Sequence, residues 1–352
     1  MPIATGSAPP PGRRIAVIVN GNAKSVTEEV LSTLDAILEA GDLYVSRSLA
    51  EGASIARTVL DRGYGTVLTG GGDGTFTNIV TEVVQEARRR GVRPPRFGLL
   101  RLGTGNSLAW VVGASDLAGA KGRGLAADVQ RLRGEAGARP MRLVEVEGIL
   151  APFCGFGIDA DILADFHRVR AMFRRSRLPM RWVGGGVSYF VAVATMSLPQ
   201  YLVKPIPFVR VTNLGSDAYH MGESGRPTGA PIRAGELIYE GKARMVSTST
   251  IPYYGFGFRV FPFADERPDR MALRVTTIGS IEFLANFKPL WRGEYSNPTS
   301  LFDYLVDRVR IEVEPATAFQ VGGDAMGTRS DVEVALSSEP IELVDFYAPP
   351  RG

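Results

Sequence analysis

The run from Val67 to Thr81 constrains the fold of this chain more than any other stretch. It reads Val-Leu-Thr-Gly-Gly-Gly-Asp-Gly-Thr-Phe-Thr-Asn-Ile-Val-Thr, which predicts a buried strand, a glycine turn and a helix that begins near Thr75. Glycine leaves no Cβ between the backbone and a ligand, so several N–H groups of such a turn can point at phosphate oxygens. The positive end of the helix dipole favours an anion at the same place. The run therefore predicts a phosphate-binding loop.

Asp73 lies inside this loop and needs its own explanation. A carboxylate among anion-binding amides repels an anionic ligand unless it coordinates a cation or takes a proton. This placement predicts a role in Mg²⁺ binding, direct or through water, or in general-base catalysis. A simple connection between a strand and a helix would suit a lone Gly-x-Gly better than the five-residue run Gly71–Thr75.

The pattern of strand, glycine turn and helix occurs on both sides of this run. Strands are predicted at 14–20, 43–48 and 97–102, helices at 27–38 and 50–62, and glycine turns at 20–25 and 103–106. Regular alternation of this kind is typical of a doubly wound parallel sheet, whose ligands bind at the carboxyl ends of the strands. No Gly-x-Gly-x-x-Gly fingerprint of a dinucleotide site accompanies it.

From about Pro140 the alternation gives way to short strands with glycine or proline at their ends, which predicts an antiparallel β-sandwich. These strands are predicted at 143–147, 203–212, 237–246, 259–262, 272–277 and 308–313, with helices at 161–180, 185–196 and 281–290 and a last strand at 341–347.

At 352 residues the chain is long enough for two domains. We expect an α/β domain at 13–139 that includes a returning strand near 335–348, and a β-sandwich domain at 140–334 with a helical insertion at 161–200. Residues 1–12 are small and proline-rich without an apolar segment, so we expect a disordered start rather than a signal peptide.

Composition excludes several classes of protein. The net charge of +3 gives no strong nucleic-acid signal, and no window of eighteen apolar residues predicts a transmembrane helix. The single cysteine, Cys154, excludes an internal disulfide and fits a reducing cytoplasm.

One local stretch departs from this modest charge. Residues 167–177 hold five arginines and one histidine, with Met172 and Phe173 among them, and aromatic residues follow up to 190. Such a segment can lie on an anionic membrane surface. A solvated helical face whose arginines pair with carboxylates explains the composition equally well.

Two motifs together give a family resemblance. The Gly-Gly-Asp-Gly-Thr run and the segment Leu102–Ala109, about thirty residues further on, resemble the catalytic domain of the diacylglycerol kinase and sphingosine/ceramide kinase superfamily. The resemblance implies ATP and Mg²⁺ as cofactors and a lipid hydroxyl as phosphate acceptor, with peripheral attachment of the 167–190 segment to the inner face of the membrane. The residues implied to contact the nucleotide are Asn20, Lys24, Gly71, Gly72, Gly74, Thr75, Gly103, Thr104, Gly105, Asn106 and Asp324.

The resemblance also implies an acceptor site. The segment Gly155–Asp161 is similar to one in sphingosine and ceramide kinases in which an aspartate contacts the polar head of the lipid. Asp161 would bind the acceptor, with Asp159 behind it, while Asp73 would act as base or metal ligand. A helix N-cap is the alternative role for Asp161, and the two roles are compatible.

Two departures from the family pattern bear on the substrate. Gly322 stands at the first position of an Asp-Gly-Glu motif and Asp324 at the third, where it would still reach Mg²⁺; Arg142 stands where bacterial diacylglycerol kinases have an aspartate base. These changes favour ceramide or a sphingoid base as acceptor, with diacylglycerol as the alternative. NAD kinases share the Gly-Gly-Asp-Gly-Thr loop, and a catalytically inactive regulator that binds lipid or nucleotide is an alternative of another class. The oligomeric state stays open.

Overall fold

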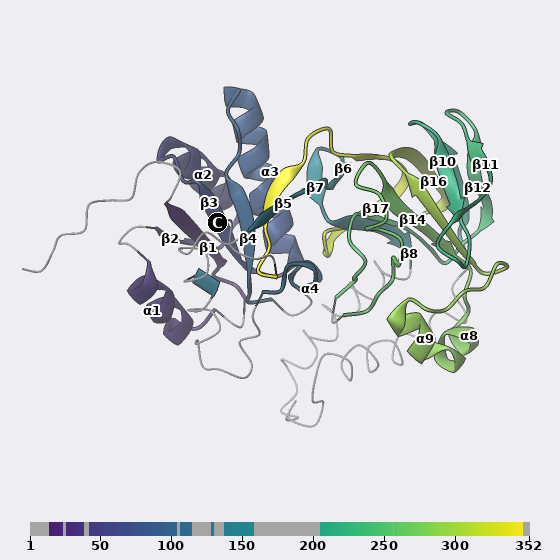
Figure 1. Cartoon of the computed structure of the whole chain (residues 1–352), viewed down its shortest axis with the longest axis horizontal. Coiled ribbons are helices and arrows are strands. Elements are labelled where there is room, and N and C mark those ends of the chain that lie inside the picture. Colours follow the sequence, from purple (N-terminus) through teal and green to yellow (C-terminus); the bar gives the residue numbers. More distant parts are fainter. Residues whose placement is uncertain are drawn as a thin grey trace, which may run out of the picture. The chain divides into compact units, whose positions relative to one another are not determined.

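The chain divides into two compact units, Met1–Met141 together with Ile341–Gly352, and Arg142–Pro340. The computed structural model describes residues 14–23, 26–38, 42–103, 106–114, 128–129, 137–157, 205–255 and 257–347. Figure 1 shows the helices and strands of both units. The expected disordered start at 1–12 and the expected helical insertion at 161–200 lie outside the described residues.

The first unit contains one six-stranded sheet with the strand order β2-β1-β3-β4-β18-β5. Its strands are β1 (Ile15–Asn20), β2 (Leu43–Ser46), β3 (Thr66–Gly71), β4 (Arg96–Arg101), β5 (Ala138–Met141) and β18 (Ile341–Val344). All neighbours pair in parallel except β18 and β5, which are antiparallel. The interiors of β1, β3 and β4 are buried. Helices cover the faces of a parallel sheet, and its strands are therefore continuous apolar runs in the sequence.

Four described helices accompany this sheet. They are α1 (Glu28–Ile37), α2 (Leu49–Asp61), α3 (Asp73–Arg90) and α4 (Ala109–Val112). Side chains cap the first two, since Thr27 Oγ1 accepts from Val30 N and Ser48 Oγ accepts from Glu51 N. Helix α3 begins at Asp73, earlier than the sequence predicted, because Gly72 serves as its N-cap in an extended conformation without a side-chain bond. An acidic residue in the first turn suits the helix dipole.

The second unit contains one antiparallel sheet of twelve strands. Its strands are β6 (Val144–Val146), β7 (Ile149–Ala151), β8 (Phe153–Gly157), β9 (Phe208–Asn213), β10 (Ala218–Met221), β11 (Pro227–Ile232), β12 (Leu237–Lys242), β13 (Met245–Ser249), β14 (Met271–Thr276), β15 (Leu301–Val306), β16 (Arg308–Val321) and β17 (Asp324–Leu336). The first half of β16 pairs with β9 and its second half with β8. This long strand therefore joins two groups of strands around a common core.

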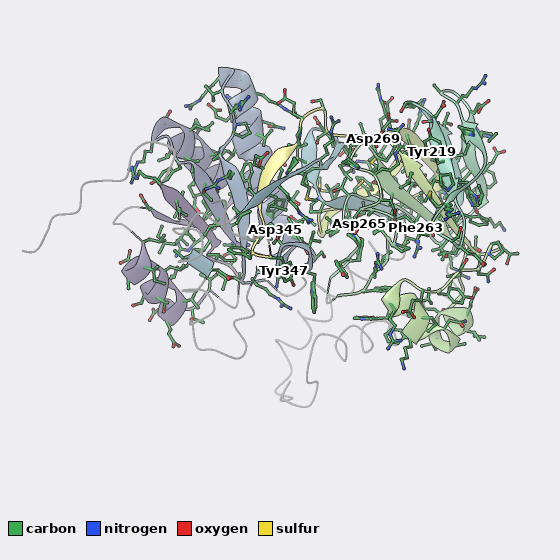
Figure 2. The ribbon with its side chains drawn as sticks, viewed as in Figure 1. Tyr219, Phe263, Asp265, Asp269, Asp345 and Tyr347 are labelled. Carbon is green, nitrogen blue, oxygen red and sulfur yellow. The ribbon has the colours of Figure 1, made fainter. Side chains whose placement is uncertain are left out.

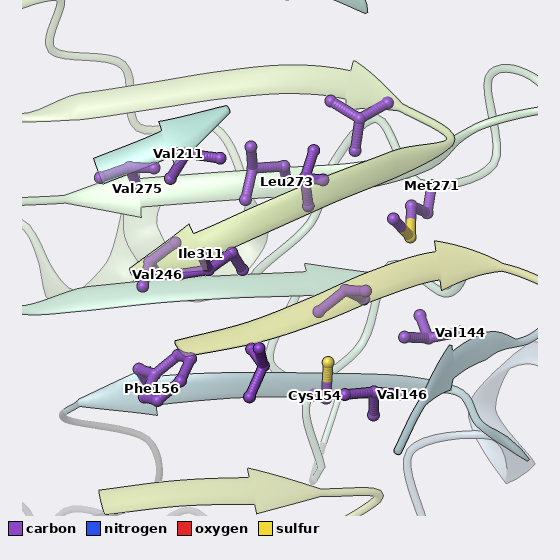
Figure 3. Close-up of a cluster of buried hydrophobic side chains, with 14 of the residues drawn as sticks. Val144, Val146, Cys154, Phe156, Val211, Val246, Met271, Leu273, Val275 and Ile311 are labelled. Atoms are coloured by element: carbon purple, nitrogen blue, oxygen red, sulfur yellow. The ribbon is translucent and has the colours of Figure 1, made fainter. Parts of the chain in front are cut away.

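Figure 3 shows part of that core, in which Val144, Cys154, Phe156 and Leu273 are buried together. The Sγ of Cys154 lies 3.2 Å from Thr248 Oγ1, so the cysteine is a buried packing residue with one polar neighbour.

The predicted fold class, a parallel α/β domain followed by an antiparallel β domain, is confirmed. Two local predictions differ from the structure. Residues 259–262 form no strand but belong to an irregular segment, since Val260 and Phe261 pack into a separate cluster with Met245. The single helix predicted at 281–290 is two short helices, α8 (Ser280–Ala285) and α9 (Phe287–Arg292). No helix in the described ranges could cross a bilayer.

Candidate nucleotide site

The candidate site lies at the carboxyl ends of β1, β3 and β4, which are neighbours in the first sheet. Each of these strands runs into a segment that contains glycine, at Gly21, Gly71–Gly72 and Gly103. Parallel strands bring their carboxyl ends to the same edge, and ligands of open α/β sheets bind at that edge. The structure thus brings together three of the loops that the sequence singled out.

The second and third loops touch backbone to backbone. A Cβ added at Gly103 would overlap the Cα and N atoms of Gly72 and would lie 2.7 Å from the carbonyl oxygen of Gly71. Such separations are far inside van der Waals contact, so no residue other than glycine fits at position 103 without moving the facing loop. The close approach leaves two stretches of backbone side by side at the sheet edge, with no side chains between them.

The first loop joins the others through Asn20 and Thr75. Asn20 Nδ2 donates to Thr75 Oγ1 at 3.1 Å, and Asn20 Oδ1 accepts from Asn22 N at 2.9 Å. A Cβ at Gly71 would overlap the same threonine hydroxyl. The predicted site residues Asn20, Gly71 and Thr75 therefore form one contact network at the start of α3.

Gly21 ties the first loop to the neighbouring strand β2. Its N–H donates to Ser46 O at 2.8 Å, a bond that proline lacks the hydrogen to make. A Cβ at this position would lie 2.8 Å from Val45 Cγ1. A glycine at position 21 therefore allows the first loop to lie against the end of β2.

Asp73 is the buried carboxylate of the site, at 9% relative exposure. Its Oδ2 accepts from Ser107 N at 2.9 Å and its Oδ1 accepts from Leu108 N at 3.3 Å. Burial raises the pKa of Asp73, and the hydrogen bonds from Ser107 and Leu108 oppose that rise in part. The carboxylate therefore holds the loop after β4 against the start of α3, a connection that the sequence did not indicate.

Asn106 closes the loop after β4 on itself. Its backbone has a φ of 46°, in the left-handed region that asparagine tolerates better than most residues. Its Oδ1 accepts from Gly103 N at 3.1 Å, and its Nδ2 donates to Gly103 O. The structure therefore places this predicted nucleotide contact in the loop's own hydrogen bonds.

Arg101 is a cation at the same edge that the sequence analysis missed. It is the last residue of β4 and is the register partner of Gly71. Its guanidinium carbon lies 5.0 Å from the ring centroid of Trp110, which is 40% exposed on α4. The signal that would have found it is an arginine at a strand end, two residues before the glycine turn that begins at Gly103.

The segment after β18 contacts the end of α4. Phe346 N donates to Val112 O at 2.8 Å, and a Cβ at Gly113 would lie 2.8 Å from the ring of Tyr347. Figure 2 labels Tyr347 and Asp345 in this segment. The helix that follows the third loop is thus anchored to the segment directly after β18, the strand between β4 and β5.

Asp324 lies in the second unit. Gly322 and Gly323 have φ values of 57° and 86°, and Val321 pairs with Asp324 across them, which is the geometry of a two-residue hairpin turn between β16 and β17. Gln320, fully buried, accepts from Gly323 N at 3.1 Å. The motif that resembled Asp-Gly-Glu is therefore the tip of a β-hairpin.

Asp269 is engaged by cations in the second unit. Arg267 and Arg270 both donate to its carboxylate, and both guanidinium carbons lie within 6 Å of the Tyr219 ring, at 5.2 and 5.9 Å. Figure 2 labels Asp269 and Tyr219. The hydrogen bonds from Arg267 lower the pKa of Asp269, so they stabilise the charged form of this carboxylate.

Several predicted residues fall outside the described ranges. These are Lys24, Thr104, Gly105, Asp159, Asp161 and the basic segment 167–190. Gly74 lies in the first turn of α3. Among the described residues, no group of three or more His, Cys, Asp or Glu side chains is arranged to hold a metal ion.

Comparison with known proteins identifies the class. Residues 14–133 match the family model of the diacylglycerol kinase catalytic domain, so the chain carries this catalytic domain. The match lies within the first unit and confirms the resemblance to the catalytic domain of lipid kinases that the two motifs predicted. No curated protein matches the sequence.

Solved structures share the fold over nearly the whole chain. A protein of Bacillus anthracis strain Sterne, named as a candidate diacylglycerol kinase, has 15% identity and a TM-score of 0.62, with 96% of this chain and 98% of that chain covered. A diacylglycerol kinase from the same organism has 13% identity and a TM-score of 0.57, with 95% and 97% covered. At these identities the likeness establishes the two-domain fold.

Proposed function

We propose that the chain transfers the γ-phosphate of ATP to the hydroxyl of a membrane lipid, and that this lipid is ceramide or a sphingoid base. The observation that carries the proposal is the contact between the two glycine loops, together with the hydrogen bonds that the Asp73 carboxylate accepts from the loop after β4. A connection between a strand and a helix has no need for glycines that meet backbone to backbone. A phosphate-binding edge does, because amide groups must be free of side chains to reach the phosphate oxygens.

Phosphoryl transfer needs positioning and neutralisation of charge more than covalent chemistry from the protein. The amides of Gly71 to Thr75 and of Gly103 would contact phosphate oxygens, and the N-terminus of α3 would add its dipole. Arg101 would neutralise part of the phosphate charge from the neighbouring strand. Asn20, through Thr75, would hold the rim of the loop in place.

Asp73 would position the loops and face the nucleotide's metal ion. Each of its oxygens accepts one backbone N–H and has a further lone-pair direction for a water or a cation. The residues present fit a Mg²⁺ that is bound mainly by ATP phosphates and water, since Mg²⁺ commonly takes one or two carboxylates from the protein. Asp73 would supply one such carboxylate, and the family resemblance implies Asp324 as another. The ion would neutralise charge on the transferred phosphate.

Diacylglycerol is the second candidate acceptor. It is favoured by the name of the matching family model and of the Bacillus anthracis structures, whereas Gly322, in place of a carboxylate, favours the sphingolipid. Asp161 and Asp159 would bind the acceptor in either case. We place the enzyme at the cytoplasmic face of the membrane as a peripheral protein.

The test is phosphate transfer from labelled ATP with Mg²⁺ to micellar ceramide, sphingosine and diacylglycerol, side by side, with NAD as the soluble control. Label on ceramide or sphingosine supports the proposal in full. Label on diacylglycerol alone keeps the lipid kinase and refutes the sphingolipid. Thermal stabilisation by ATP without transfer to any acceptor would show a nucleotide-binding regulator instead.

Arg101 allows a sharper test of where the phosphates bind. Arg101→Gln should raise the KM for ATP about tenfold through loss of one charged contact. Arg96→Gln, at the opposite end of the same strand, is the matched control and should leave the KM unchanged. Equal KM values for both variants would place the phosphates away from Arg101.

A further inference from the structure

The segment between β14 and β15 forms two short helices, α8 and α9, at one end of the second unit (Figure 1). Ile281 is 80% exposed and Leu284 is 48% exposed on α8. Lys288 and Arg292 are exposed on α9. We call these four residues the α8–α9 surface. Two aliphatic side chains three residues apart on α8, with two exposed cations on the next helix, give this segment an exposed apolar and basic character.

The inward side of the same helices is already packed. The ring centroids of Phe283 and Phe287 lie 5.8 Å apart, those of Phe287 and Trp291 5.5 Å, and those of Phe258 and Trp291 5.1 Å with nearly parallel planes. Leu290 is 6% exposed. The core side of α8 and α9 is therefore complete without Ile281 and Leu284.

The acidic residue of α8 is turned away from the α8–α9 surface. Glu282 Oε1 accepts from Ser300 Oγ at 2.6 Å, Tyr295 Oη at 2.8 Å and Asn297 Nδ2 at 2.7 Å. These donors, Ser300 above all, lower the pKa of Glu282. The charge of Glu282 is thus stabilised on the inner side.

The cations of the α8–α9 surface are weakly compensated. Lys288 forms no ion pair with a residue in the described ranges, and Arg292 Nη1 lies 3.9 Å from Glu294 Oε2 with both side chains more than half exposed. An exposed pair at this distance contributes little. The surface therefore combines apolar side chains with a positive charge. The charge is complementary to anionic lipid head groups, and the apolar side chains are more stable in a bilayer than in water.

We propose that the α8–α9 surface docks the enzyme onto an anionic lipid bilayer. Ile281 and Leu284 enter the interfacial layer, and Lys288 and Arg292 extend their aliphatic stems along it and reach the lipid phosphates. The proposal rests on the proposed function in one respect, namely that the acceptor lipid lies in a bilayer. It places a membrane contact in a part of the chain other than the basic segment 167–190.

The experiment is co-sedimentation of the full chain, without ATP, with vesicles of phosphatidylcholine alone or mixed with phosphatidylserine. Binding should favour the anionic vesicles and weaken as salt is added. Ile281→Asp with Leu284→Asp should lower the partition coefficient about 30-fold. Lys288→Gln with Arg292→Gln should lower it about tenfold on anionic vesicles and remove most of the salt dependence.

Two residues of β12 provide matched controls. Leu237 is 48% exposed, as Leu284 is, and Lys242 is exposed at the end of the same strand. Leu237→Asp and Lys242→Gln should leave the partition coefficient within about twofold of the wild-type value, because β12 is not part of the α8–α9 surface. Circular dichroism and melting curves confirm that every variant is folded.

A parallel assay separates docking from chemistry. On a short-chain, water-soluble acceptor the Ile281 and Leu284 variant should turn over as the wild type does, while on vesicles it should lose activity. Failure of the wild type to bind any vesicle, or equal binding by the variants, overturns the proposal. So does a wild-type dimer that the Asp variant converts to monomer with unchanged vesicle affinity, because a second copy then covers the surface. Vesicle binding as expected without phosphorylation of any acceptor supports docking and refutes the kinase proposal alone.

Discussion

The tripeptide Gly-Gly-Asp occurs twice in this chain, at Gly71–Asp73 and at Gly322–Asp324, and the two copies fold differently. In the first, Gly72 is extended and Asp73 begins the long helix α3. In the second, both glycines have positive φ and Asp324 begins a strand. Glycine is required for opposite reasons, because the first copy needs the missing Cβ and the second needs the left-handed backbone.

The sequence on either side decides between these outcomes. The first copy follows a short apolar strand and precedes a helical pattern, so the chain turns from sheet edge to helix. The second copy joins two long strands that pair with each other, and a two-residue turn with positive φ matches the twist of such a hairpin. The tripeptide alone therefore indicates neither a phosphate site nor a turn.

The largest expected effect is on the contact between the glycine loops. Gly103→Ala should destabilise the protein by about 3 kcal/mol or more, because the new methyl group overlaps backbone that cannot rotate away. ATP binding should be lost with it. Urea denaturation and calorimetric titration with ATP measure the two effects.

Gly323→Ala is the control from the second copy. A Cβ there meets nothing within 4 Å, and the left-handed φ alone should cost about 1 to 2 kcal/mol. ATP affinity should be retained in this variant. Equal losses of stability in the two alanine variants would show that the loop contact around Gly103 relaxes freely and does not demand glycine.

The next largest effect is on turnover. Asp73→Asn should lower kcat about 100-fold, since it removes the charge that faces the metal and leaves an amide donor against a backbone donor of Ser107 or Leu108. Asp324→Asn should instead raise the Mg²⁺ concentration needed for half-maximal activity, with a smaller loss of kcat. Initial rates over a Mg²⁺ titration separate the two. A wild-type kcat in Asp73→Asn would remove this residue from the chemistry.

Much of the first unit could be predicted from sequence for a physical reason. Its parallel strands are buried on both faces and read as short apolar runs, and each glycine turn marks a carboxyl end. The bond from Asp73 to the backbone of Ser107 and Leu108 could not be predicted, because it joins residues more than thirty positions apart. The loop-closing bonds of Asn106 could not be predicted either, since a side chain that closes its own loop looks the same in sequence as one that contacts a ligand. Its contact with the nucleotide stays a prediction.

The strands of the second unit were harder to predict from the sequence. The first half of strand β17 has no buried residue and lacks the alternation that predicts a half-buried strand, whereas exposed and buried residues alternate from Asp331 to Val334. The run around Val260 and Phe261 has the composition of a strand yet packs as an irregular segment. Antiparallel pairing is decided by partners distant in sequence, and local composition carries little of that information.

A smaller effect is expected from rebuilding the Asp-Gly-Glu pattern at the hairpin. Gly322→Asp with Asp324→Glu should cost about 1 kcal/mol, because aspartate tolerates the left-handed region better than most residues. If the missing carboxylate disfavours diacylglycerol, the variant should phosphorylate it a few-fold faster relative to ceramide, about threefold for one weak additional contact. An unchanged ratio would separate acceptor choice from this turn.

The smallest effect is a pH dependence that distinguishes the buried aspartate of the first copy. Burial raises the folded-state pKa of Asp73 above its ordinary value of 3.8, so between these two values the folded protein holds more protons than the unfolded chain. Stability from this residue is then present at low pH and declines as pH rises through the window, with no further change above the folded pKa.

Asp73→Asn removes this decline. The free energy of unfolding of the variant, minus that of the wild type, should therefore increase as pH rises from about 4 and then level off. Urea denaturation at a series of pH values measures the difference, and Asp324→Asn measured in the same way controls for the exchange of a carboxylate for an amide. Parallel curves for Asp73→Asn and the wild type would mean that the amides of Ser107 and Leu108 compensate the burial of the charge in full. Folding would then leave the protonation equilibrium of the carboxylate in the first Gly-Gly-Asp unchanged, and only the kinetics of Asp73→Asn would test a functional charge at Asp73.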